Sequence, residues 1–582
     1  MLFFLLTLCK QSVFYDRIFN VKRTIVICEY ISTGFNYVED VHARGYEPVL
    51  VEGSYIGTDE EQALLREIRD AANKKIGNSV RIIRENPNYS EILKQVREVN
   101  PVAVVAGSEF GVPLATKLAS DLGLPGNPVS ALPAMTEKDA MHEALRKHGI
   151  RFIRGKVLTG ESDAIEYYKS LGTEDVVIKR ARGAGTQGVF ICHGYDEMLS
   201  AVRKSFGQNL KDGSESVAVL MQERIIGTEY IVNTVSCEGR HQAVSVWKYD
   251  KIRMPNGTNA YNNAMVVPRL EVGHSEMIRY ALQVANAIGI KYGPVHGEYM
   301  VDDKGPVLIE VNCRPMGGGL QRKYVEQIFG HHETDLALDS YLNPVKFNEG
   351  FFKPYRVNKF GAIKFLIMPH DTEVNSAPIL QIAKHLRSYY SSSFDRIGRA
   401  STLPETTNLE TAGGTIYLLH NDERIVKEDC NLLHLIETKY PNILFQAHSA
   451  DKSKNYPKPD PKAVMEAGNC KGATLVFSDT AKNLDGATVV NLAQLSGAYD
   501  SYEQGILDLS KQSSFADLES VIQQIFVFAS KIRRGGRILI PQSTYAHLPY
   551  GMDGMEILLK VVGLRIELPL EGMVSVLVAS VE

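Results

Sequence analysis

Apolar runs of strand length alternate with helical patterns through the residues that follow Arg23. The apolar, β-branched runs are TIVICE (24–29), PVLVEG (48–53) and PVAVVAGSE (101–109). Helical patterns follow the first run near 36–44 and the third run through about Leu122. Strands that alternate with helices in this way are typical of an α/β layer with parallel strands. We therefore predict a small doubly wound domain over 23–125.

A further helix is predicted to begin at Thr136. Thr136 and Asp139 have the spacing of a capping box, and Gly149 suits the position just past a helix end. Lys138 falls in the first turn, where a cation opposes the helix macrodipole at a cost of roughly a few tenths of a kcal/mol. Lys138 either points into solvent or compensates an anion at that end of the helix.

Beyond this helix the pattern changes to β-rich hairpins with helices between them, from about 175 to 345. DKSKNYPKPDPK (451–462) is charged, studded with proline and without apolar period, which predicts a linker. We expect an α/β (α+β) chain with a main domain over 126–345, its C-terminal part over 346–450, and an accessory α/β domain over 463–582.

Length and composition set the class of protein. With 582 residues, 44% hydrophobic and 23% charged, the chain has the composition of a globular protein with about three to five domains. A formal net charge of −4 offers no basic field for a nucleic-acid backbone, so nucleic acid is not an expected partner. The seven cysteines are scattered and never spaced C-x-x-C, which argues against a disulfide framework or a zinc site and fits a reducing cytoplasm.

The apolar start MLFFLLTLC (1–9) is too short to span a bilayer and has neither a basic leader nor a small-residue cleavage site. We interpret it as an over-extended start rather than a signal peptide. No later segment reaches the roughly 18 uninterrupted apolar residues that a membrane helix needs. We therefore expect a cytoplasmic protein with no membrane partner.

The segment KRARGAGTQGVFIC (179–192) has the spacing G-x-G-x-x-G at Gly183, Gly185 and Gly188. A dinucleotide fingerprint needs a helix after the glycines, whereas Val-Phe-Ile-Cys is β-forming, so a Rossmann site is disfavoured. A Walker A loop would need Gly-Lys-Ser/Thr, and a protein kinase would need H-R-D and D-F-G. The segment predicts a hairpin loop whose N–H groups close over phosphates, with Lys179 ending the preceding strand. A glycine-rich surface turn is the alternative.

Residues 297–314 predict two strands joined by the turn Asp302-Asp303-Lys304-Gly305. Period 2 places Leu308, Glu310 and Asn312 on one face, and Val307, Ile309 and Val311 on the other. Counting back across the turn sets Glu298 opposite Glu310 to within one residue. Facing carboxylates repel unless a cation lies between them, and hard oxygen ligands suit Mg²⁺. A solvated acidic face is the alternative.

Arg314 follows shortly after this strand and precedes Pro315 and the run Gly317-Gly318-Gly319, which would let backbone approach a ligand closely. Cys313 invites a nucleophile interpretation, but period 2 puts it on the core-facing side, so we assign it to packing. In MQERIIGTEYIVNTV (221–235), acidic residues flank a turn at Gly227, which taken alone is a hairpin with exposed acids.

Together these elements resemble the ATP-grasp superfamily in order and spacing, over about residues 23–345. The resemblance lies in Lys138, K-R-x-x-G-x-G-x-x-G-V (179–189), Q-E-R-I-I-G-T-E-Y (222–230), H-G-E-Y-M-V (296–301) and L-I-E-V-N-C-R-P (308–315). Within it the chain is most similar to the L-amino-acid ligases and the carboxylate-amine ligases that make dipeptides and dapdiamide-type antibiotics. That similarity lies in W-K-Y-D-K (247–251), Val266-Val267-Pro268 and R-P-M-G-G-G-L (314–320). The implied fold is an ATP-grasp fold whose N-terminal domain is the pre-ATP-grasp domain.

The resemblance also implies site residues by position. Those that would bind ATP are Lys138 and Lys179 at the phosphates, the backbone of Gly183, Gly185, Thr186, Gln187 and Gly188 over the β- and γ-phosphates, Gln222, Glu223 and Ile225 in the adenine hinge, and Glu229 at the ribose. The matching magnesium ligands are Glu298, Glu310 and Asn312, with Mn²⁺ as the alternative ion. Arg314 matches the arginine that steadies the transferred phosphate, and with Lys179 is the expected catalytic pair. The amino-acid pocket does not carry over, and His296, Gly317 and Gly318 are its expected edges.

The activity implied is that of an ATP-dependent ligase that forms an amide through an acyl phosphate and releases ADP and phosphate. Its expected partners are a small-molecule carboxylate, a small-molecule amine and a second copy of the chain in a homodimer. A role in secondary metabolism would follow from the analogy alone. Alternatives are a carboxylase or carbamoyl-phosphate type of ATP-grasp enzyme, for which no biotin-carrier motif or glutaminase domain is seen, and an ATP-binding regulatory protein.

The C-terminal stretch FASKIRRGGRILIPQSTY and the segments after it look like the last third of a class I methyltransferase: a strand after a Gly-Gly turn, a helix and a closing β-hairpin. No glycine-rich loop for S-adenosylmethionine precedes them. We expect a non-catalytic domain used for dimerisation or for covering the active site, with a bifunctional ligase-methyltransferase as the alternative.

Overall fold

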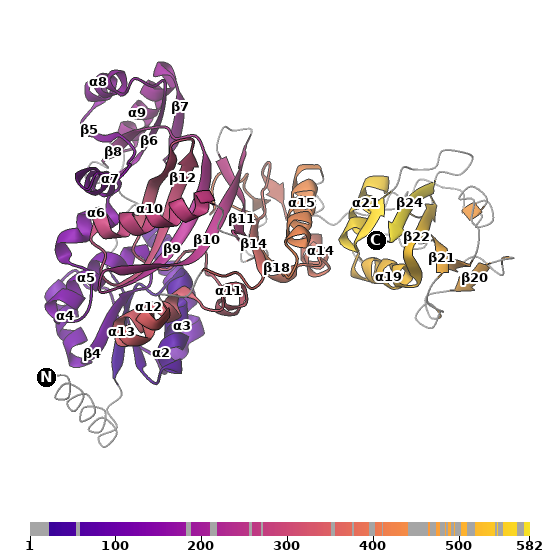
Figure 1. Ribbon diagram of the computed structural model, residues 1–582, viewed down its shortest axis with the longest axis horizontal. Coiled ribbons are helices and arrows are strands. Elements are labelled where there is room, and N and C mark those ends of the chain that lie inside the picture. The colour runs from indigo at the N-terminus through magenta and orange to yellow at the C-terminus, as the bar shows by residue number, and fades with distance from the viewer. Residues whose placement is uncertain are drawn as a thin grey trace. The chain divides into compact units, whose positions relative to one another are not determined.

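The computed structural model describes residues 23–53, 59–181, 188–209, 218–254, 259–268, 272–350, 355–374, 377–394, 402–409, 411–439 and parts of 464–581. The predicted linker at 451–462 and the apolar start lie outside these residues. The chain divides into two compact units: Met1–Tyr249 with Met265–Lys359, and Asp250–Ala264 with Phe360–Glu582. Figure 1 labels the elements along the chain. Among the described residues, none of the helices has both the length and the apolar character needed to cross a membrane.

The first unit begins with a four-stranded parallel sheet, as the alternating pattern predicts. Its strands are β1 (Thr24–Cys28), β2 (Glu47–Val51), β3 (Arg81–Ile83) and β4 (Pro101–Ala106), in the order β3-β2-β1-β4. The helices between them are η1 (Ser32–Phe35), α2 (Asn36–Ala43), α3 (Asp59–Ile76), η2 (Gly77–Ser79), α4 (Tyr89–Glu98), η3 (Glu109–Gly111) and α5 (Val112–Asp121). The predicted α/β fold class is confirmed.

Apolar side chains of this sheet pack on both of its faces. One face, with Ile25, Ile27 and Leu50, packs against α2 and against α12 (Glu333–Leu342), which comes from far along the chain. The other face, with Val26 and Val49, packs against α4 and α5. Parallel strands covered on both faces form a doubly wound layer.

The carboxyl edge of this sheet is closed by backbone packed directly on backbone. A Cβ on Gly34 would lie 2.1 Å from the Gly107 carbonyl oxygen, and one on Gly111 would lie 2.2 Å from that of Cys28. Only glycine permits these approaches. The loop after β1 and the loop after β4 therefore lie together, and they carry Ser32, Thr33 and Glu109 to the same edge.

The predicted glycine-loop hairpin is confirmed in a second, antiparallel sheet. Its strands are β5 (Gly155–Leu158), β8 (Val219–Glu223), β6 (Asp175–Arg180) and β7 (Phe190–His193), in that spatial order. The helices η4 (Val129–Ala131), α6 (Leu132–Thr136) and α7 (Lys138–Lys147) precede it. The helices α8 (Glu161–Leu171) and α9 (Tyr195–Asn209) share its core. Strands β6 and β7 pair antiparallel, with Ile178 opposite Phe190, so the glycines lie between strands and not before a helix.

The rest of the first unit is built on a larger antiparallel arrangement. Strands β13 (Gly305–Asn312), β12 (Gly293–Asp302), β9 (Thr228–Cys237) and β10 (Arg240–Arg253) are neighbours in this order. Helix α10 (Val272–Ile288) packs on them in a core that includes Val232, Val284 and Val295. Helices α11 (Arg322–Phe329), α12 and α13 (Pro344–Gly350) follow.

Two local predictions are wrong. Thr136 is not a helix N-cap, because α6 ends at this residue and its hydroxyl donates to the Leu132 carbonyl at 2.9 Å. Helix α7 begins at Lys138 with Glu137 at its N-cap, whose side chain makes no capping bond. Thr136 therefore has a helical backbone as the last residue of α6 and cannot cap α7.

The second wrong prediction concerns Leu308. Glu298 lies opposite Glu310, but Tyr299 lies opposite Leu308, so Ile309 is an extra residue in β13. This β-bulge breaks the alternation of side chains. Leu308 is consequently fully buried in the α10 core and does not share the face of Glu310.

The second unit contains two sheet regions. The first has β11 (Asn259–Val266), β14 (Phe360–Phe365), β18 (Thr415–His420) and β16 (Tyr389–Ser393), with α14 (Pro378–Lys384), α15 (Glu423–Lys439) and the short pair β15 (Thr372–Glu373) and β17 (Thr402–Leu403). The second is ordered β20 (Ala487–Val490), β19 (Thr474–Phe477), β21 (Tyr502–Leu507), β22 (Ile532–Pro541), β24 (Val576–Val581) and β23 (Leu564–Ile566). It includes α19 (Leu518–Ser530) and α21 (Gly551–Val561), and β24 runs antiparallel to both β22 and β23.

Candidate functional site

Two carboxylates face each other on the β12–β13 hairpin. Glu298 lies directly opposite Glu310, as predicted, and the Asn312 amide donates to the Glu310 carboxylate at 3.4 Å. His296 lies opposite Asn312, and its Nε2 is 3.3 Å from a carboxylate oxygen of Glu298. The hairpin thus brings together the three expected metal ligands and one expected edge of the substrate pocket.

Lys138 completes this group from the start of α7. Its ammonium is 2.8 Å from the Glu310 carboxylate, and its backbone N–H donates to the Ala181 carbonyl at 3.2 Å. Burial disfavours ionisation of Glu310, but the ammonium groups of Lys138 and Lys179 outweigh it and lower the pKa of Glu310 to about 2. Lys138 is therefore not a solvated lysine, because it compensates a carboxylate contributed by another element.

Lys179 lies beside this pair on β6 and is buried. Burial, together with the neighbouring charge of Lys138, lowers the pKa of the Lys179 ammonium to about 8, while Glu310, Glu298 and Glu229 oppose the shift. Among the described residues it has no ion pair within 4 Å. Of the glycine loop that follows, Gly183, Gly185, Thr186 and Gln187 lie outside the described residues, and Gly188 has a φ of 71°.

The expected adenine hinge lies at the end of β8. Gln222 is buried, and its side-chain Nε2 has no hydrogen-bond partner among the described residues. The Glu223 carboxylate instead pairs with Arg154 at 2.7 Å. Ile225 lies in the turn before β9, and Glu229 lies on β9 opposite Met300. The Gln222 amide thus has a donor to offer a ligand.

Arg314 is held at the carboxyl edge of the parallel sheet. Its guanidinium is 3.6 Å from the Glu109 carboxylate and donates to the Pro315 carbonyl at 3.1 Å. Burial raises the pKa of Glu109, and Arg314 opposes that shift. Glu109 is not among the predicted site residues, although it ends the run PVAVVAGSE (101–109). Ligands of open α/β sheets bind beyond the carboxyl ends of the strands, and that rule would have singled it out.

The glycine run after Arg314 is fixed to the first domain by hydrogen bonds. The Thr33 hydroxyl donates to the Gly317 carbonyl at 3.4 Å and accepts from the Leu320 N–H at 2.9 Å. The Ser32 hydroxyl accepts from the Gly319 N–H at 3.1 Å. The Asn36 amide donates to the Leu320 carbonyl at 2.9 Å. Gly317 and Gly318, expected at the substrate pocket, therefore lie on a loop anchored beside Glu109.

Buried polar groups continue behind the hairpin. His296 is 4% exposed, and its Nδ1 is 2.8 Å from the side-chain oxygen of Asn233. Tyr249 is also buried there, and its pKa is raised well above the ordinary value by burial and next by the charge of Glu298. Neither residue is among the predicted site residues, although Tyr249 lies in W-K-Y-D-K (247–251) and Asn233 in the run 221–235.

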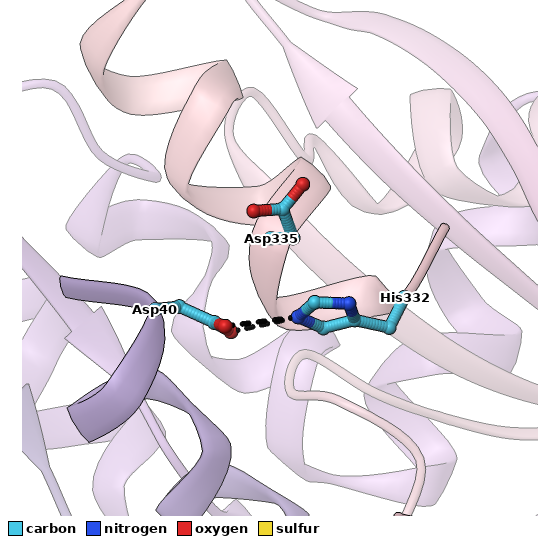
Figure 2. Close-up of side chains that lie close together, drawn as sticks. All are labelled: Asp40, His332 and Asp335. Carbon is cyan, nitrogen blue, oxygen red and sulfur yellow. Dashed lines mark hydrogen bonds and ion pairs between the residues drawn. The ribbon is translucent and has the colours of Figure 1, made fainter. Parts of the chain in front are cut away.

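A separate acidic cluster contains Asp40, His332 and Asp335, whose candidate ligand atoms lie within 4.8 Å of one another. Figure 2 shows the His332 ring directed at Asp40, with Asp335 on the neighbouring helix. The His332 Nε2 is 2.9 Å from Asp40 and its Nδ1 is 2.9 Å from Glu326, while Arg44 pairs with Asp335 at 2.6 Å. Basic side chains of the protein already contact these carboxylates, so the cluster fastens α12 to α2.

Comparison with known proteins identifies the family of the domain. Residues 136–318 match the family described as ATP-grasp domain. Dapdiamide A synthase of Enterobacter agglomerans is 27% identical over 431 residues, which cover 73% of this chain and 98% of that protein. An L-arginine-specific L-amino acid ligase of Bacillus subtilis is 24% identical over 273 residues, which cover 45% of this chain and 65% of that protein.

Solved structures agree on the fold. An L-amino acid ligase from Bacillus licheniformis superimposes with a TM-score of 0.54 at 18% identity, covering 71% of this chain and 97% of that chain. A carboxyaminoimidazole ribonucleotide synthase from Aspergillus clavatus complexed with ATP gives a TM-score of 0.52 at 14% identity, covering 72% and 99%. The chain carries an ATP-grasp domain, and the predicted similarity to amino-acid ligases and dapdiamide-type carboxylate-amine ligases is confirmed, as is the enzyme class of ATP-dependent ligase.

Proposed function

We propose that this ATP-grasp ligase joins two amino acids, or amino-acid-like acids, through an amide bond. The observation that carries the proposal is the set of opposed charges at the β12–β13 hairpin. Glu298 and Glu310 face each other, Lys138 is paired with Glu310, and Lys179 is buried beside them with no ion pair of its own among the described residues. This arrangement suits a polyphosphate that brings its own cation.

The chemistry of the donor set fits a divalent cation. Glu298, Glu310 and Asn312 offer two carboxylates and one carboxamide, which are hard oxygen ligands of the kind that Mg²⁺ and Mn²⁺ prefer. We propose that these three residues hold Mg²⁺, which would neutralise charge on the phosphate oxygens of ATP. With ATP present, Lys138 would exchange its contact with Glu310 for one with phosphate.

The proposed reaction has two steps. A carboxylate oxygen of the first substrate attacks the γ-phosphorus, the bond between that phosphorus and the bridging oxygen breaks, and ADP leaves. The amine nitrogen of the second substrate then attacks the acyl carbon, the carbon–oxygen bond to phosphate breaks, and phosphate leaves while the nitrogen loses a proton. Lys138 and Lys179 would bind phosphate, and Arg314 would stabilise the charge that develops on the transferred group.

The other candidate functions are distinguished from the ligase by residues, by coverage or by a direct test. A regulatory ATP-binding protein has no need of both Glu298 and Glu310, which are present and in register. The carbamoyl phosphate synthase large chain of Deinococcus deserti is 23% identical over 240 residues and is covered over 23% of its length. A ligase-methyltransferase would bind S-adenosylmethionine in a direct titration.

The experiment is phosphate release from Mg-ATP by the full chain across a matrix of paired amino acids, with mass spectrometry of every active pair. A matched Glu310→Gln variant serves as the control. The proposal predicts release that requires a specific pair, a product lighter than the pair by one water, and loss of both signals in the variant. Silence across the matrix from a protein that binds ATP would contradict the joining of amino acids.

A further inference from the structure

A row of buried side chains connects the carboxylate hairpin to α12. His296 on β12 lies opposite Asn233 on β9, and Asn233 lies opposite Ser245 on β10, so the three side chains stand on adjacent strands in register. The Asn233 amide donates to the Ser245 hydroxyl at 2.8 Å, and the Ser245 hydroxyl donates to the Glu333 carboxylate at 3.3 Å. All four residues are less than 9% exposed.

Glu333 ends this row and is also the anchor of the loop that begins at Arg314. Its second carboxylate oxygen accepts the backbone N–H of Met316 at 2.8 Å. Met316 lies two residues after Arg314 and one before the glycines that Ser32 and Thr33 bind. The loop is therefore held on one side by the first domain and on the other by Glu333.

The direction of the hydrogen bonds requires Glu333 to accept at both oxygens. The Ser245 hydroxyl already accepts from Asn233 and from the Trp247 ring N–H, at 2.8 and 3.2 Å, so its only proton is directed to Glu333. The Met316 N–H can only donate. Burial of a carboxylate is costly and raises the pKa of Glu333, with the Met316 N–H and the charge of His296 as the leading opposing contributions. Each oxygen of the buried Glu333 carboxylate therefore accepts one hydrogen bond, from Ser245 and from Met316.

We propose that Glu333 is a positioning residue for the loop that begins at Arg314. Through Met316 it fixes where Arg314 lies relative to Glu298 and Glu310, so that the transferred phosphate meets both sides of the site in one geometry. The inference rests on the proposed function for its kinetic consequence, whereas its structural consequence is independent of the substrates. A misplacement of about 1 Å in such a site can cost about 10²-fold in rate.

The discriminating variant is Glu333→Gln, which keeps the shape of the side chain and replaces one acceptor with a donor. Its amide nitrogen would face either the Met316 N–H or the Ser245 hydroxyl, which already accepts two hydrogen bonds, so one contact is lost. Glu326→Gln is the matched control, since this carboxylate is 41% exposed on the adjacent helix and does not bond the loop. Ser245→Ala is a second variant, which removes the proton donor of Glu333 and also the acceptor of the Asn233 amide and the Trp247 ring N–H.

The test uses the full chain and two readouts. Hydrogen exchange followed by mass spectrometry should show faster exchange in the peptide containing Met316–Leu320 for Glu333→Gln and Ser245→Ala, and no change for Glu326→Gln. With an active substrate pair, Glu333→Gln should lower kcat about 10- to 10²-fold while the KM for ATP stays within about twofold, because no nucleotide contact is touched.

Unchanged exchange in a folded Glu333→Gln or Ser245→Ala variant would overturn the positioning role, whatever the activity. A kcat equal to that of the unsubstituted chain would overturn it as well. Faster exchange in a chain that joins no amino acids would uphold the positioning of the loop and count against the proposed function alone.

Discussion

Two buried lysine–carboxylate groups in the described part of the chain differ in how completely their charges are matched. In the second unit, the Lys364 ammonium donates to both oxygens of Glu437 at 2.6 and 2.7 Å and to the Phe365 carbonyl at 2.7 Å. The Ile367 N–H also donates to Glu437, and both side chains are almost completely buried. Every strong donor and acceptor of this pair is used inside the fold.

The hairpin site is the opposite case. Lys138 and Glu310 are paired at 2.8 Å but remain 12% and 19% exposed, and Lys179 adds a second ammonium that pairs with no described residue. Charged side chains that are partly exposed, or that have no ion-pair partner, can exchange their contacts for contacts with a ligand. The comparison indicates that a saturated pair is costly to break, whereas an unsaturated group of the same residue types is free to exchange a contact for one with a ligand.

The largest expected effect breaks the saturated pair. Lys364→Met should destabilise β14 and α15 by about 3–5 kcal/mol, because the buried charge of Glu437 would lose the ammonium that contacts both of its oxygens. Hydrogen exchange of these two elements measures the change locally, which avoids assuming two-state unfolding of a chain with two units. The double variant Lys364→Met/Glu437→Leu should recover most of the loss. Equal loss in single and double variants would show that the pair is not saturated as described.

The next effect concerns turnover. Arg314→Ala should lower kcat by roughly 10²- to 10³-fold, about 2.7–4.1 kcal/mol, as loss of one group that stabilises developing charge typically does. ATP affinity should change little. Arg387→Ala, at an arginine that is 41% exposed and pairs with Glu428, is the matched control. Near-normal turnover of Arg314→Ala would remove Arg314 from the chemistry.

A smaller effect on stability is expected from removing Lys138 at the hairpin site. Lys138→Met should change the free energy of unfolding by less than about 1 kcal/mol, because Glu310 keeps Lys179 nearby and is partly exposed. The same variant should weaken ATP binding about tenfold or more, since a charge-assisted contact is worth about 1.5–3 kcal/mol. Calorimetric titration with ATP measures the affinity. A large loss of stability in Lys138→Met would show that Lys138, like Lys364, serves the fold rather than ligand binding.

The smallest effect is a pH dependence. Burial and Lys138 lower the pKa of Lys179 from 10.5 to about 8, and bound polyphosphate would raise it again. ATP affinity should therefore be flat below pH 8 and fall about tenfold per pH unit above it, until the pKa of the complex is reached. Lys179→Arg, which stays charged, should give a flat profile. A fall that persists in this variant would assign the titration to another group.

The lowered pKa of Lys179 also affects stability in the absence of ATP. The unfolded chain binds a proton at this residue up to about pH 10.5, whereas the folded chain releases it from about pH 8. Between these values the unfolded state holds more protons, so the contribution of Lys179 makes the free energy of unfolding rise with pH. In the Lys179→Arg variant this rise should be absent.

Local sequence patterns predicted the carboxylate hairpin well, because a turn of four residues fixes the register of the two strands beside it. Counting from the turn at Asp302–Gly305 sets Glu298 opposite Glu310 to within one residue, and the bulge at Ile309 supplies that one-residue shift. The β-branched residues after the glycines likewise predicted a hairpin instead of a dinucleotide loop. In both cases the deciding interactions lie within about a dozen residues of one another.

The rest could not be predicted because it depends on contacts between distant segments. The bulge at Ile309 buries Leu308 in the core that contains α10, and no residue type in the strand predicts it. Glu109 joins the site from the parallel sheet, and only its position after a buried strand gave a signal. Glu333 is the first residue of α12, and nothing in its neighbourhood links it to Ser245 or Met316.

The most direct test of the acyl-phosphate route follows the transfer of an oxygen atom from the substrate carboxylate to phosphate. With the active pair identified, the carboxylate substrate is labelled with ¹⁸O in both oxygens and the released phosphate is analysed by mass spectrometry. Attack of the carboxylate on the γ-phosphorus predicts one ¹⁸O in every phosphate formed, with none in ADP. Unlabelled phosphate, or label in AMP, would contradict the acyl-phosphate route and the role assigned to the Glu298, Glu310, Lys138 and Lys179 site.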